Sequence, residues 1–404
     1  MSISEQALGH LKVVELCNLV SGPYCTKLLA DLGAEVIKIE APGTGDEARR
    51  RGPFLGDRAR PELSGLFLHL NTNKLGITLD VKTATGKDIL IELIKQADVF
   101  VEDNPPAVMA ELELTYGFLE SVNPHLVMAS ITPFGQTGPY RDFRAYELNS
   151  CHAGGEGYLL PLHSYEPHRE PVKPGGIVGD CACGLSASLA ILSAAYVMAA
   201  TGIGQHIDVS KQDVLMSLVQ NHVCTYANMG EVHDRLRTGF LMVLPLKCRD
   251  GYIQLTIVTD REWNSLVEAM GNPTWAEDER FASWAGRHWW GIEINPRVQE
   301  WALQFPKEEL FHKLQSYNVA AVPVATAEDL AHSIQLQERG FFAEIDHLEA
   351  GTLAYPTAAY QFTETPWRGV SAAPLLGQHN ELVYCERLGF SRHQLGKLAE
   401  AGII

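Results

Sequence analysis

Residues 11–39, LKVVELCNLVSGPYCTKLLADLGAEVIKI, decide the fold class of this chain. Residues 11–16 alternate in polarity as a strand does, and residues 35–39 form a second strand. Between them, residues 23–32 have the pattern of a short helix, with a proline near the first turn and Gly33 at the end. A strand, a helix and a strand within about 30 residues make a βαβ unit, which predicts a parallel sheet.

The same α/β pattern continues downstream of this unit. Further strands are predicted at residues 77–80, 99–102, 126–131 and, after a turn, within 202–210. Helices are predicted over residues 84–96 and 211–229. The turn at Ser21-Gly22-Pro23 lacks the GxGxxG fingerprint, so the sequence does not support an ordinary nicotinamide or flavin site.

The character of the sequence changes near residue 230. A β-hairpin with an Asp-Gly turn over residues 246–255 precedes mostly helical segments that hold six of the seven tryptophans. The α/β pattern then resumes near residue 319. We therefore predict a large domain from residues 1–225, a small domain over 226–318, and a segment 319–404 that returns to the large domain.

The composition excludes several classes of protein. With 404 residues, 46 % of them hydrophobic, the chain can build a large core or two domains. Its formal net charge of −17 argues against a nucleic-acid surface, which needs clustered Lys and Arg. We find no run of about 18 uninterrupted apolar residues and no signal-peptide pattern, so we expect no membrane partner. Eight cysteines without a CxxC pair predict free thiols in a reducing cytoplasm and no metal site.

One carboxylate, Asp180, precedes the most apolar stretch of the chain, within IVGDCACG at residues 177–184. The run over residues 185–196 is small and apolar on nearly every side, which predicts a buried helix. Two interpretations of Asp180 are open at this point. It caps the helix, a position that Asp favours, or it is a carboxylate kept ionised by the helix N-terminus and used as a nucleophile.

Three consecutive arginines, Arg49, Arg50 and Arg51, lie in a Gly/Pro-rich loop that follows the strand at residues 35–39. Runs of charge usually form a solvated face. Ligands of open α/β sheets bind beyond the carboxyl ends of the strands, so the same arginines are also candidates for binding phosphate groups.

Nine stretches, taken together and in order, carry a resemblance to a known family. They are Ser21-Gly22-Pro23, Leu28 to Glu40, Gly43 to Asp46, Asn73 to Asp80, Phe134 to Pro139, Gly179-Asp180, Thr201 to Gln205, Thr365 to Arg368 and Pro374 to His379. With them the chain resembles the class III, or CaiB/BaiF-like, CoA-transferases. That family includes formyl-CoA and carnitine CoA-transferases and the α-methylacyl-CoA racemases.

The resemblance implies an α/β fold with a Rossmann-like large domain, an inserted smaller α+β domain, and two chains interlocked as a dimer. It implies an enzyme that moves CoA from an acyl-CoA donor to a free carboxylic acid, with coenzyme A as cosubstrate and no tightly bound cofactor. In family transferases the aspartate at the position of Asp180 attacks the donor thioester. A mixed anhydride and then an aspartyl-CoA thioester form, and the acceptor carboxylate reverses the steps.

The same motifs name the residues expected to contact CoA or substrate. They are Val20, Ser21, Arg49, Arg50, Asn73, Lys74, Asp103, Phe134, Gly135, Gln136 and Tyr146. The family's arginines for the CoA phosphates are incomplete here: Ala41 replaces one, and Glu111 stands where another is expected. Either the loop arginines or Lys74 hold the phosphates, or the chain is one subunit of a heteromer whose partner supplies more of the CoA site.

Alternatives to a homodimeric transferase remain. Family racemases pair the aspartate with a histidine, and Tyr146 occupies that position. Because the ordinary pKa of tyrosine is about 10, it is a poor substitute, which disfavours a racemase. A weakly active or structural subunit of a heteromer is the other alternative.

The acceptor pocket is expected from the loops at residues 150–176 and 222–245. Their apolar and aromatic side chains are Tyr158, Leu159, Leu160, His163, Tyr165, Tyr226, Phe240 and Leu241. Such side chains suit a bulky, aromatic or dicarboxylic acceptor, with succinyl-CoA as the donor.

Overall fold

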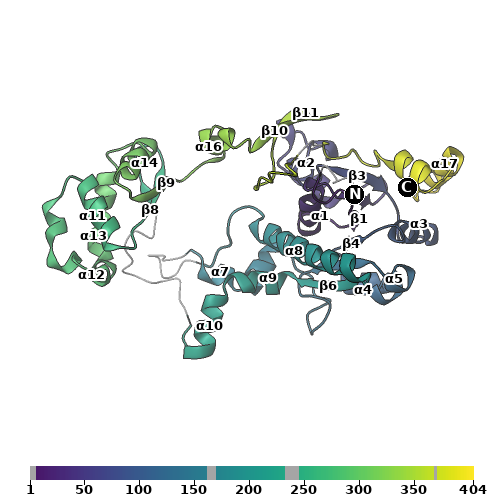
Figure 1. The fold of residues 1–404 in the computed structure, drawn as a ribbon, viewed down its shortest axis with the longest axis horizontal. Helices are drawn as coiled ribbons and strands as arrows, with labels where there is room; N and C mark the ends of the chain where they lie inside the picture. The colour runs from purple at the N-terminus through teal and green to yellow at the C-terminus, as the bar shows by residue number, and fades with distance from the viewer. Residues whose placement is uncertain (1–5, 162–169, 233–244, 368–370) are drawn as a thin grey trace. The chain divides into compact units, whose positions relative to one another are not determined.

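The computed structural model describes residues 6–161, 170–232, 245–367 and 371–404. Four of the expected pocket residues lie outside these ranges, namely His163, Tyr165, Phe240 and Leu241. The chain divides into two compact units (Figure 1). The larger comprises Met1–Glu156, Lys173–Asn221 and Glu338–Ile404, and the smaller comprises Gly157–Val172 and His222–Gln337.

The centre of the larger unit is a six-stranded sheet whose neighbouring strands are all parallel, in the order β3-β2-β1-β4-β5-β6. The strands are β1 (Lys12–Leu16), β2 (Glu35–Glu40), β3 (Lys74–Thr78), β4 (Val99–Glu102), β5 (Val127–Thr132) and β6 (Gln205–Ser210). This is the doubly wound Rossmann order, whose direction reverses between β1 and β4. The predicted α/β class with a Rossmann-like domain is confirmed.

Helices cover both faces of this sheet, because its strands are apolar on both sides. On one face, α1 (Ser21–Asp31) and α8 (Val178–Thr201) share a core with strand residues such as Val13 and Val101. Val14 belongs to the core on the other face. The helical elements of that face are α3 (Ala84–Ile94), α4 (Pro106–Glu111), α5 (Tyr116–Val122), η6 (Glu381–Arg387) and α17 (Arg392–Glu400).

The helix α8 begins before Asp180, not after it. Its N-cap residue is Ile177, so Asp180 stands in the first helical turn. The interpretation of Asp180 as the N-cap is therefore wrong. Gly179 allows this early start, because a Cβ there would lie 2.7 Å from Sγ of Cys151.

By length and composition, α8 could cross a membrane, and within the described ranges it is the one helix that qualifies. The expected absence of a membrane span stays a prediction, because the core helix of a soluble protein passes the same test. In the structure, α8 packs along α1 and against β5. Its buried residues Ala187, Ile191 and Ala194 belong to the core of the large unit. A helix packed in a protein core can have the same length and composition as a membrane span.

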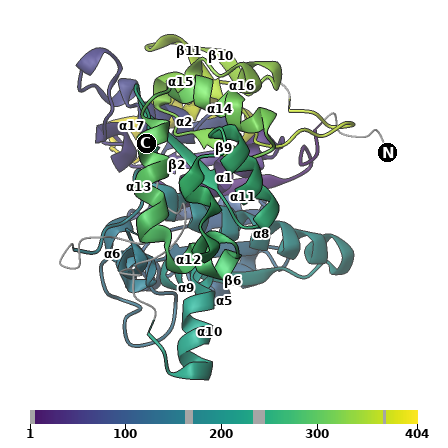
Figure 2. The same cartoon turned by 90° about the vertical axis from the view of Figure 1, so that its left-hand side faces the viewer.

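The smaller unit is built on an antiparallel sheet in the order β7-β8-β9, with strands Leu246–Lys247, Tyr252–Thr256 and Ala320–Pro323. Its helices gather around this sheet (Figure 2), and Trp263 and Phe281 lie in the shared core. They are α11 (Asp260–Ala269), α12 (Trp284–Trp289), α13 (Gly291–Ala302) and α14 (Lys307–Ser316). The short helices α15 (Ala327–Ala331) and α16 (Ile334–Glu338) follow β9 in the sequence. The sequence put the second domain boundary at residue 318, whereas the compact unit continues to Gln337, because β9 pairs with β8.

The remaining elements surround these two cores. The helix predicted over residues 211–229 is two helices, α9 (Lys211–Leu218) and α10 (Gln220–Met229), because Val219 leaves the helical conformation. The hairpin of β10 (Phe342–His347) and β11 (Gly351–Pro356) belongs to the larger unit. The short elements are η1 (Glu47–Arg50), η2 (Leu55–Asp57), η3 (Pro61–Leu63), α2 (Gly65–Leu70), α6 (Glu147–Ala153), α7 (Glu156–Leu159), η4 (Thr274–Glu277) and η5 (Glu279–Phe281).

Candidate active site

Buried charges gather where β1 and β2 approach their carboxyl ends. Glu15 Oε1 lies 2.8 Å from Lys38 Nζ, and Glu15 Oε2 lies 2.9 Å from Lys74 Nζ. Lys38 Nζ also lies 2.8 Å from Asp46 Oδ2. All four side chains are fully buried. Buried ions cost several kcal/mol each in lost hydration, and alternating the two signs offsets that cost.

The pKa values of this network follow from burial and pairing. Burial raises the pKa of Glu15, but Lys38 and Lys74 outweigh it and lower that pKa to about 2. Burial lowers the pKa of Lys74 to about 8, against the attraction of Glu15. Burial also lowers the pKa of Lys38, yet Asp46 and Glu15 raise it overall. Glu15 and Lys38 are therefore charged at neutral pH.

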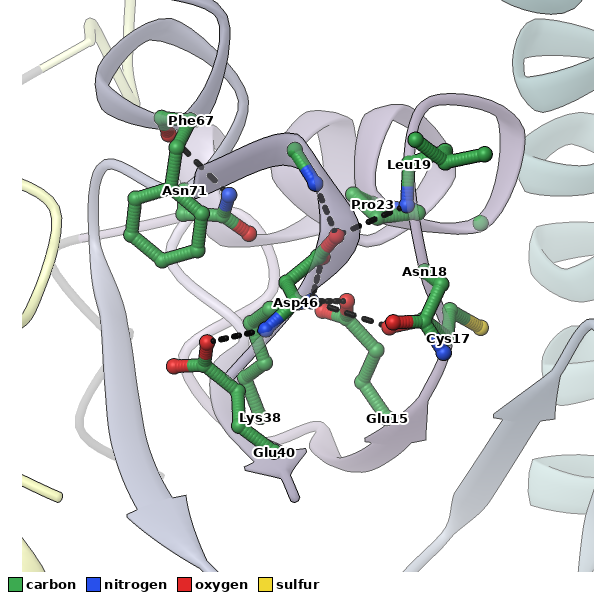
Figure 3. Close-up of polar contacts among 12 residues, drawn as sticks. Glu15, Cys17, Asn18, Leu19, Pro23, Lys38, Glu40, Asp46, Phe67 and Asn71 are labelled. Carbon is green, nitrogen blue, oxygen red and sulfur yellow. Dashed lines mark hydrogen bonds and ion pairs between the residues drawn. The ribbon is translucent and has the colours of Figure 1, made fainter. Parts of the chain in front are cut away.

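Asp46 connects this network to the start of α1. Its Oδ1 accepts hydrogen bonds from the backbone N–H of Leu19 (2.9 Å) and of Ala48 (2.8 Å), while Lys38 pairs with its other oxygen (Figure 3). Leu19 has a φ of +63°, which is uncommon for a residue with a side chain. The hydrogen bond that the Leu19 backbone donates to Asp46 stabilises that conformation, and thereby orients the turn that leads into Ser21.

Arg49 is not free to bind a phosphate group. Its Nε lies 2.6 Å from Glu40 Oε2 and its Nη1 lies 2.6 Å from Glu62 Oε2. Its Nη2 donates to the carbonyl of Pro374 over 2.9 Å, and the guanidinium stacks on Phe67. The side chain is fully buried. The predicted contact of Arg49 with CoA is therefore wrong: this arginine ties the η1 loop to the C-terminal segment.

The predicted contact of Lys74 with CoA is also wrong, because this side chain is buried and paired. Besides Glu15, its Nζ donates to the carbonyl of Pro23 and to Asn71 Oδ1, and the side chain has no exposed surface. Arg50 differs from both, because it is exposed and donates to the carbonyl of Thr44 over 2.8 Å. Of the four cations considered for the CoA phosphates, Arg50 and Arg51 keep an exposed side chain.

A second cluster surrounds Asp180. Ser21 Oγ donates to Asp180 Oδ1 over 2.8 Å, and Lys211 Nζ donates to the same oxygen over 2.9 Å. Asp180 is 8 % exposed. Ser21 comes from the first turn of α1, Asp180 from the first turn of α8, and Lys211 from the start of α9, directly after β6. Three elements thus deliver one carboxylate, one hydroxyl and one ammonium to the same point.

Asp103 lies beside this cluster. It follows β4, and the backbone N–H of Asn18 donates to both of its carboxylate oxygens, at 3.0 and 3.1 Å. Burial raises the pKa of Asp103 well above its usual value, although Lys211 opposes the shift. Burial lowers the pKa of Lys211, but Asp180 and Asp103 raise it overall. Lys211 is therefore a cation at neutral pH, paired with Asp180.

The other predicted site residues stand apart from these contacts. Val20 is buried at the N-cap of α1. Asn73 donates to Asp31 Oδ1 and accepts from the backbone of Ser371, so it fastens β3 to neighbouring segments. Tyr146 is 65 % exposed at the start of α6, and its backbone N–H donates to Asn149.

The predicted motif Phe134-Gly135-Gln136 is a loop that follows β5. The backbone N–H of Gln136 donates to both carboxylate oxygens of Asp208, each over 3.0 Å. Gly135 has a φ of +82°, which favours glycine, and Phe134 lies against the ring of Tyr140. These residues stay candidates for substrate contacts.

Lys211 is not among the site residues predicted from the sequence. The available signal was its position, immediately after a parallel strand, at the edge of the sheet where α/β proteins bind ligands. A lysine at the start of a helix otherwise looks like part of a solvated face. Only the folded chain brings it to Asp180, which lies 31 residues earlier.

A doubly wound sheet with a paired, nearly buried carboxylate beyond its strands is an arrangement typical of ligand-binding α/β proteins and enzymes. The family model for CoA-transferase family III matches residues 8–380, and the chain belongs to this family of class III CoA-transferases. It is 31 % identical to a formyl-CoA:oxalate CoA-transferase of Streptomyces avermitilis, over 99 % of this chain and 100 % of that protein. It is also 31 % identical to a succinate–glutarate CoA-transferase of Agrobacterium fabrum, over 94 % of this chain and 95 % of that one.

Solved structures agree with this assignment. A CaiB/BaiF family protein from Brucella suis superposes with a TM-score of 0.83 at 30 % identity, over 95 % of this chain and 100 % of that chain. The predicted family, enzyme class and fold are confirmed. CoA is the cosubstrate that such an enzyme requires, and the part of the chain described by the structure has no cluster of metal-ligating side chains.

Proposed function

We propose that this class III CoA-transferase moves CoA from succinyl-CoA to a dicarboxylic acid, with Asp180 as the covalent nucleophile. A mixed aspartyl anhydride and an aspartyl-CoA thioester are the intermediates. The observation that carries the proposal is the pairing of Asp180 Oδ1 with Ser21 and Lys211, at 2.8 and 2.9 Å. A carboxylate is a weak nucleophile, so it must be ionised, oriented and largely desolvated.

Burial and charge support this role. Asp180 is 8 % exposed, so little water reaches it, and an anhydride formed there would be protected from hydrolysis. Lys211 places an ammonium 2.9 Å from the carboxylate, and this pairing offsets part of the cost of burying the negative charge. Gly184, one helical turn after Asp180, allows α1 and α8 to approach closely enough for Ser21 to reach the carboxylate.

The choice of a dicarboxylic acceptor rests on two similar proteins. The names of the relatives at 31 % identity include oxalate in one case and succinate with glutarate in the other. All three are dicarboxylic acids. An aromatic acceptor such as benzylsuccinate is the finer alternative, and it rests on the apolar and aromatic side chains that the sequence supplies in residues 150–176 and 222–245.

Arg50 and Arg51 are the proposed partners of the CoA phosphates, because Arg49 and Lys74 are buried and paired with Glu40 and Glu15. The small number of available cations also favours a second candidate function. In that candidate, the chain is a subunit of a heteromer and its partner supplies further phosphate contacts. A homodimer of interlocked chains is the assembly that we propose otherwise.

The test is covalent trapping on the purified chain. Incubation with succinyl-CoA followed by hydroxylamine should modify Asp180, as seen by peptide mass spectrometry, and Asp180→Asn should abolish the modification. A panel of donors and acids (oxalate, glutarate, succinate, benzylsuccinate) then identifies the substrates. Labelling only with a co-expressed second chain would favour the heteromer. Deuterium uptake at the α-carbon of an acyl-CoA, without transfer, would favour the racemase and overturn the proposal.

A further inference from the structure

The two carboxylate oxygens of Asp180 differ in their surroundings. The hydroxyl of Ser21 and the ammonium of Lys211 both donate to Oδ1. Ser21 is 1 % exposed, and the Lys211 side chain is 16 % exposed, so both donors are held in a mostly dry site. Within the described residues, no hydrogen bond of comparable geometry reaches Oδ2. The two oxygens of this carboxylate are therefore not equivalent among the described contacts.

We propose that Ser21 and Lys211 form an oxyanion hole for Oδ1 of Asp180 when its carbonyl carbon is attacked, and that Oδ2 alone acts as the nucleophile. This inference rests on the proposed covalent role of Asp180 and assigns a separate task to each of its oxygens. Ser21 and Lys211 are catalytic residues in this scheme, because both contact a reacting atom.

The first step uses Oδ2. A lone pair on Oδ2 attacks the acyl carbon of the donor, the C–S bond breaks, and CoA leaves as a thiolate with the bonding electrons. The thiolate then attacks Cγ of Asp180, and the π electrons of the Cγ=Oδ1 bond move onto Oδ1. When they return, the Cγ–Oδ2 bond breaks and the donor acid leaves, carrying Oδ2. An aspartyl-CoA thioester remains on the enzyme.

The acceptor repeats this chemistry at the same carbon. An oxygen of the acceptor carboxylate attacks Cγ, charge moves onto Oδ1 and back, and CoA leaves as a thiolate. The thiolate attacks the acyl carbon of the acceptor, and Asp180 leaves as a carboxylate. The acceptor's oxygen is now the new Oδ2, while Oδ1 is the original atom. No proton is gained or lost in the cycle.

The charge on Oδ1 explains why these donors would accelerate the reaction. Attack on Cγ converts a neutral carbonyl oxygen into an oxyanion, so bonds from Ser21 and Lys211 strengthen most in the transition state.

An isotope experiment on the wild-type enzyme tests the proposal directly. The enzyme is turned over many times with succinyl-CoA and glutarate carrying 18O in both carboxyl groups, or with the fastest pair from the panel. Mass spectrometry then counts the 18O atoms in Asp180. We expect uptake to stop at one 18O atom, because Oδ1 never leaves. Asp208 lies in the same proteolytic peptide, with no Lys or Arg between the two, and serves as the unlabelled internal control.

Variants probe the two donors separately. Ser21→Ala and Lys211→Met should each lower kcat by about 10²-fold, the effect of removing one oxyanion donor. They should also let the carboxylate rotate, so that Asp180 acquires a second 18O atom. Lys211→Arg should restore part of the rate. Lys95→Met, which removes an exposed lysine paired with Glu92, is the matched control and should behave as wild type.

The outcomes are separable. Two 18O atoms in wild-type Asp180 would show that both oxygens attack, and would overturn the oxyanion-hole assignment while leaving the covalent mechanism intact. Transfer with no 18O in Asp180 would refute the covalent mechanism itself, and the present inference with it. Retention of a single 18O in both variants at an undiminished rate would also overturn the assignment.

Discussion

Gly184 of α8 lies directly against the carbonyl oxygen of Ser21 in α1, where a Cβ atom would stand only 2.5 Å from that oxygen. Helices with bulkier side chains at such a contact pack 8–10 Å apart, so a glycine permits a closer approach. The contact is one helical turn from Asp180, and it holds the Ser21 hydroxyl within hydrogen-bond distance of the carboxylate. The geometry of the site therefore depends on a residue without a side chain.

Gly184→Ala should impair activity more than it impairs the fold. The added methyl group must push α1 away from α8, which moves Ser21 relative to Asp180. A displacement near 1 Å at a reacting centre can cost about 10²-fold in rate. Steady-state kinetics of CoA transfer measure the loss. Gly396→Ala in α17 is the control, because a Cβ there meets no atom within 4 Å, and its activity should equal that of the parent.

Asp180→Asn should reduce transfer by more than about 10³-fold, because an amide cannot attack a thioester while it fills the same space. The melting temperature should remain close to that of the parent. Single-turnover assays with succinyl-CoA measure the rate, and Asp88→Asn, at an exposed position of α3, provides the control. Substantial residual transfer by the Asp180 variant would remove this residue from the mechanism.

Glu15→Gln should destabilise the large unit by about 3–5 kcal/mol at pH 7, because it leaves Lys38 and Lys74 buried with one carboxylate fewer. Urea unfolding measures the difference. The exposed pair of Glu92 with Lys95 offers the control Glu92→Gln, which should cost less than about 1 kcal/mol.

The pH dependence of stability should carry the signature of Glu15. Its folded pKa of about 2 lies below the ordinary value of 4.5, so its stabilisation is complete above pH 4.5. That stabilisation is lost as the pH falls from 4.5 through 2, and it amounts to roughly 3 kcal/mol. Parent and Glu15→Gln should therefore converge in stability as the solution is acidified. A constant difference between them down to low pH would contradict the assignment.

Glu102→Gln should stabilise the protein at neutral pH, whereas Glu15→Gln destabilises it. Burial raises the pKa of Glu102 to about 7, although nearby Ser130 and the hydrogen bonds donated by Asn104 oppose the shift. A raised pKa means that the folded protein favours the protonated acid, so ionisation costs stability as the pH rises from 4.5 to 7. The gain from the substitution should be larger at pH 8 than at pH 5, by about 2–3 kcal/mol. Equal differences at the two pH values would count against the raised pKa.

The sequence by itself determined the large sheet and its helices. The strand predicted at residues 99–102 is β4 (Val99–Glu102), and the second strand of residues 11–39 is β2 to within one residue. Apolar periodicity, proline and glycine act over a few residues, so these signals are readable in the chain. The nine family-like stretches together also identified the family, and Gly179-Asp180 among them gave the candidate nucleophile, before any contact was known.

The tertiary structure alone decided which polar side chains reach Asp180 and which are buried in ion pairs elsewhere in the protein. Arg49 and Lys74 looked like phosphate ligands, yet Arg49 pairs with Glu40 and Glu62, and Lys74 pairs with Glu15. Lys211 looked like a surface residue, yet it pairs with Asp180. The physical reason is that a charge in a dry interior must find an opposite charge or a polar partner. Which partner it finds depends on strand order and helix packing, which bring together residues far apart in the chain.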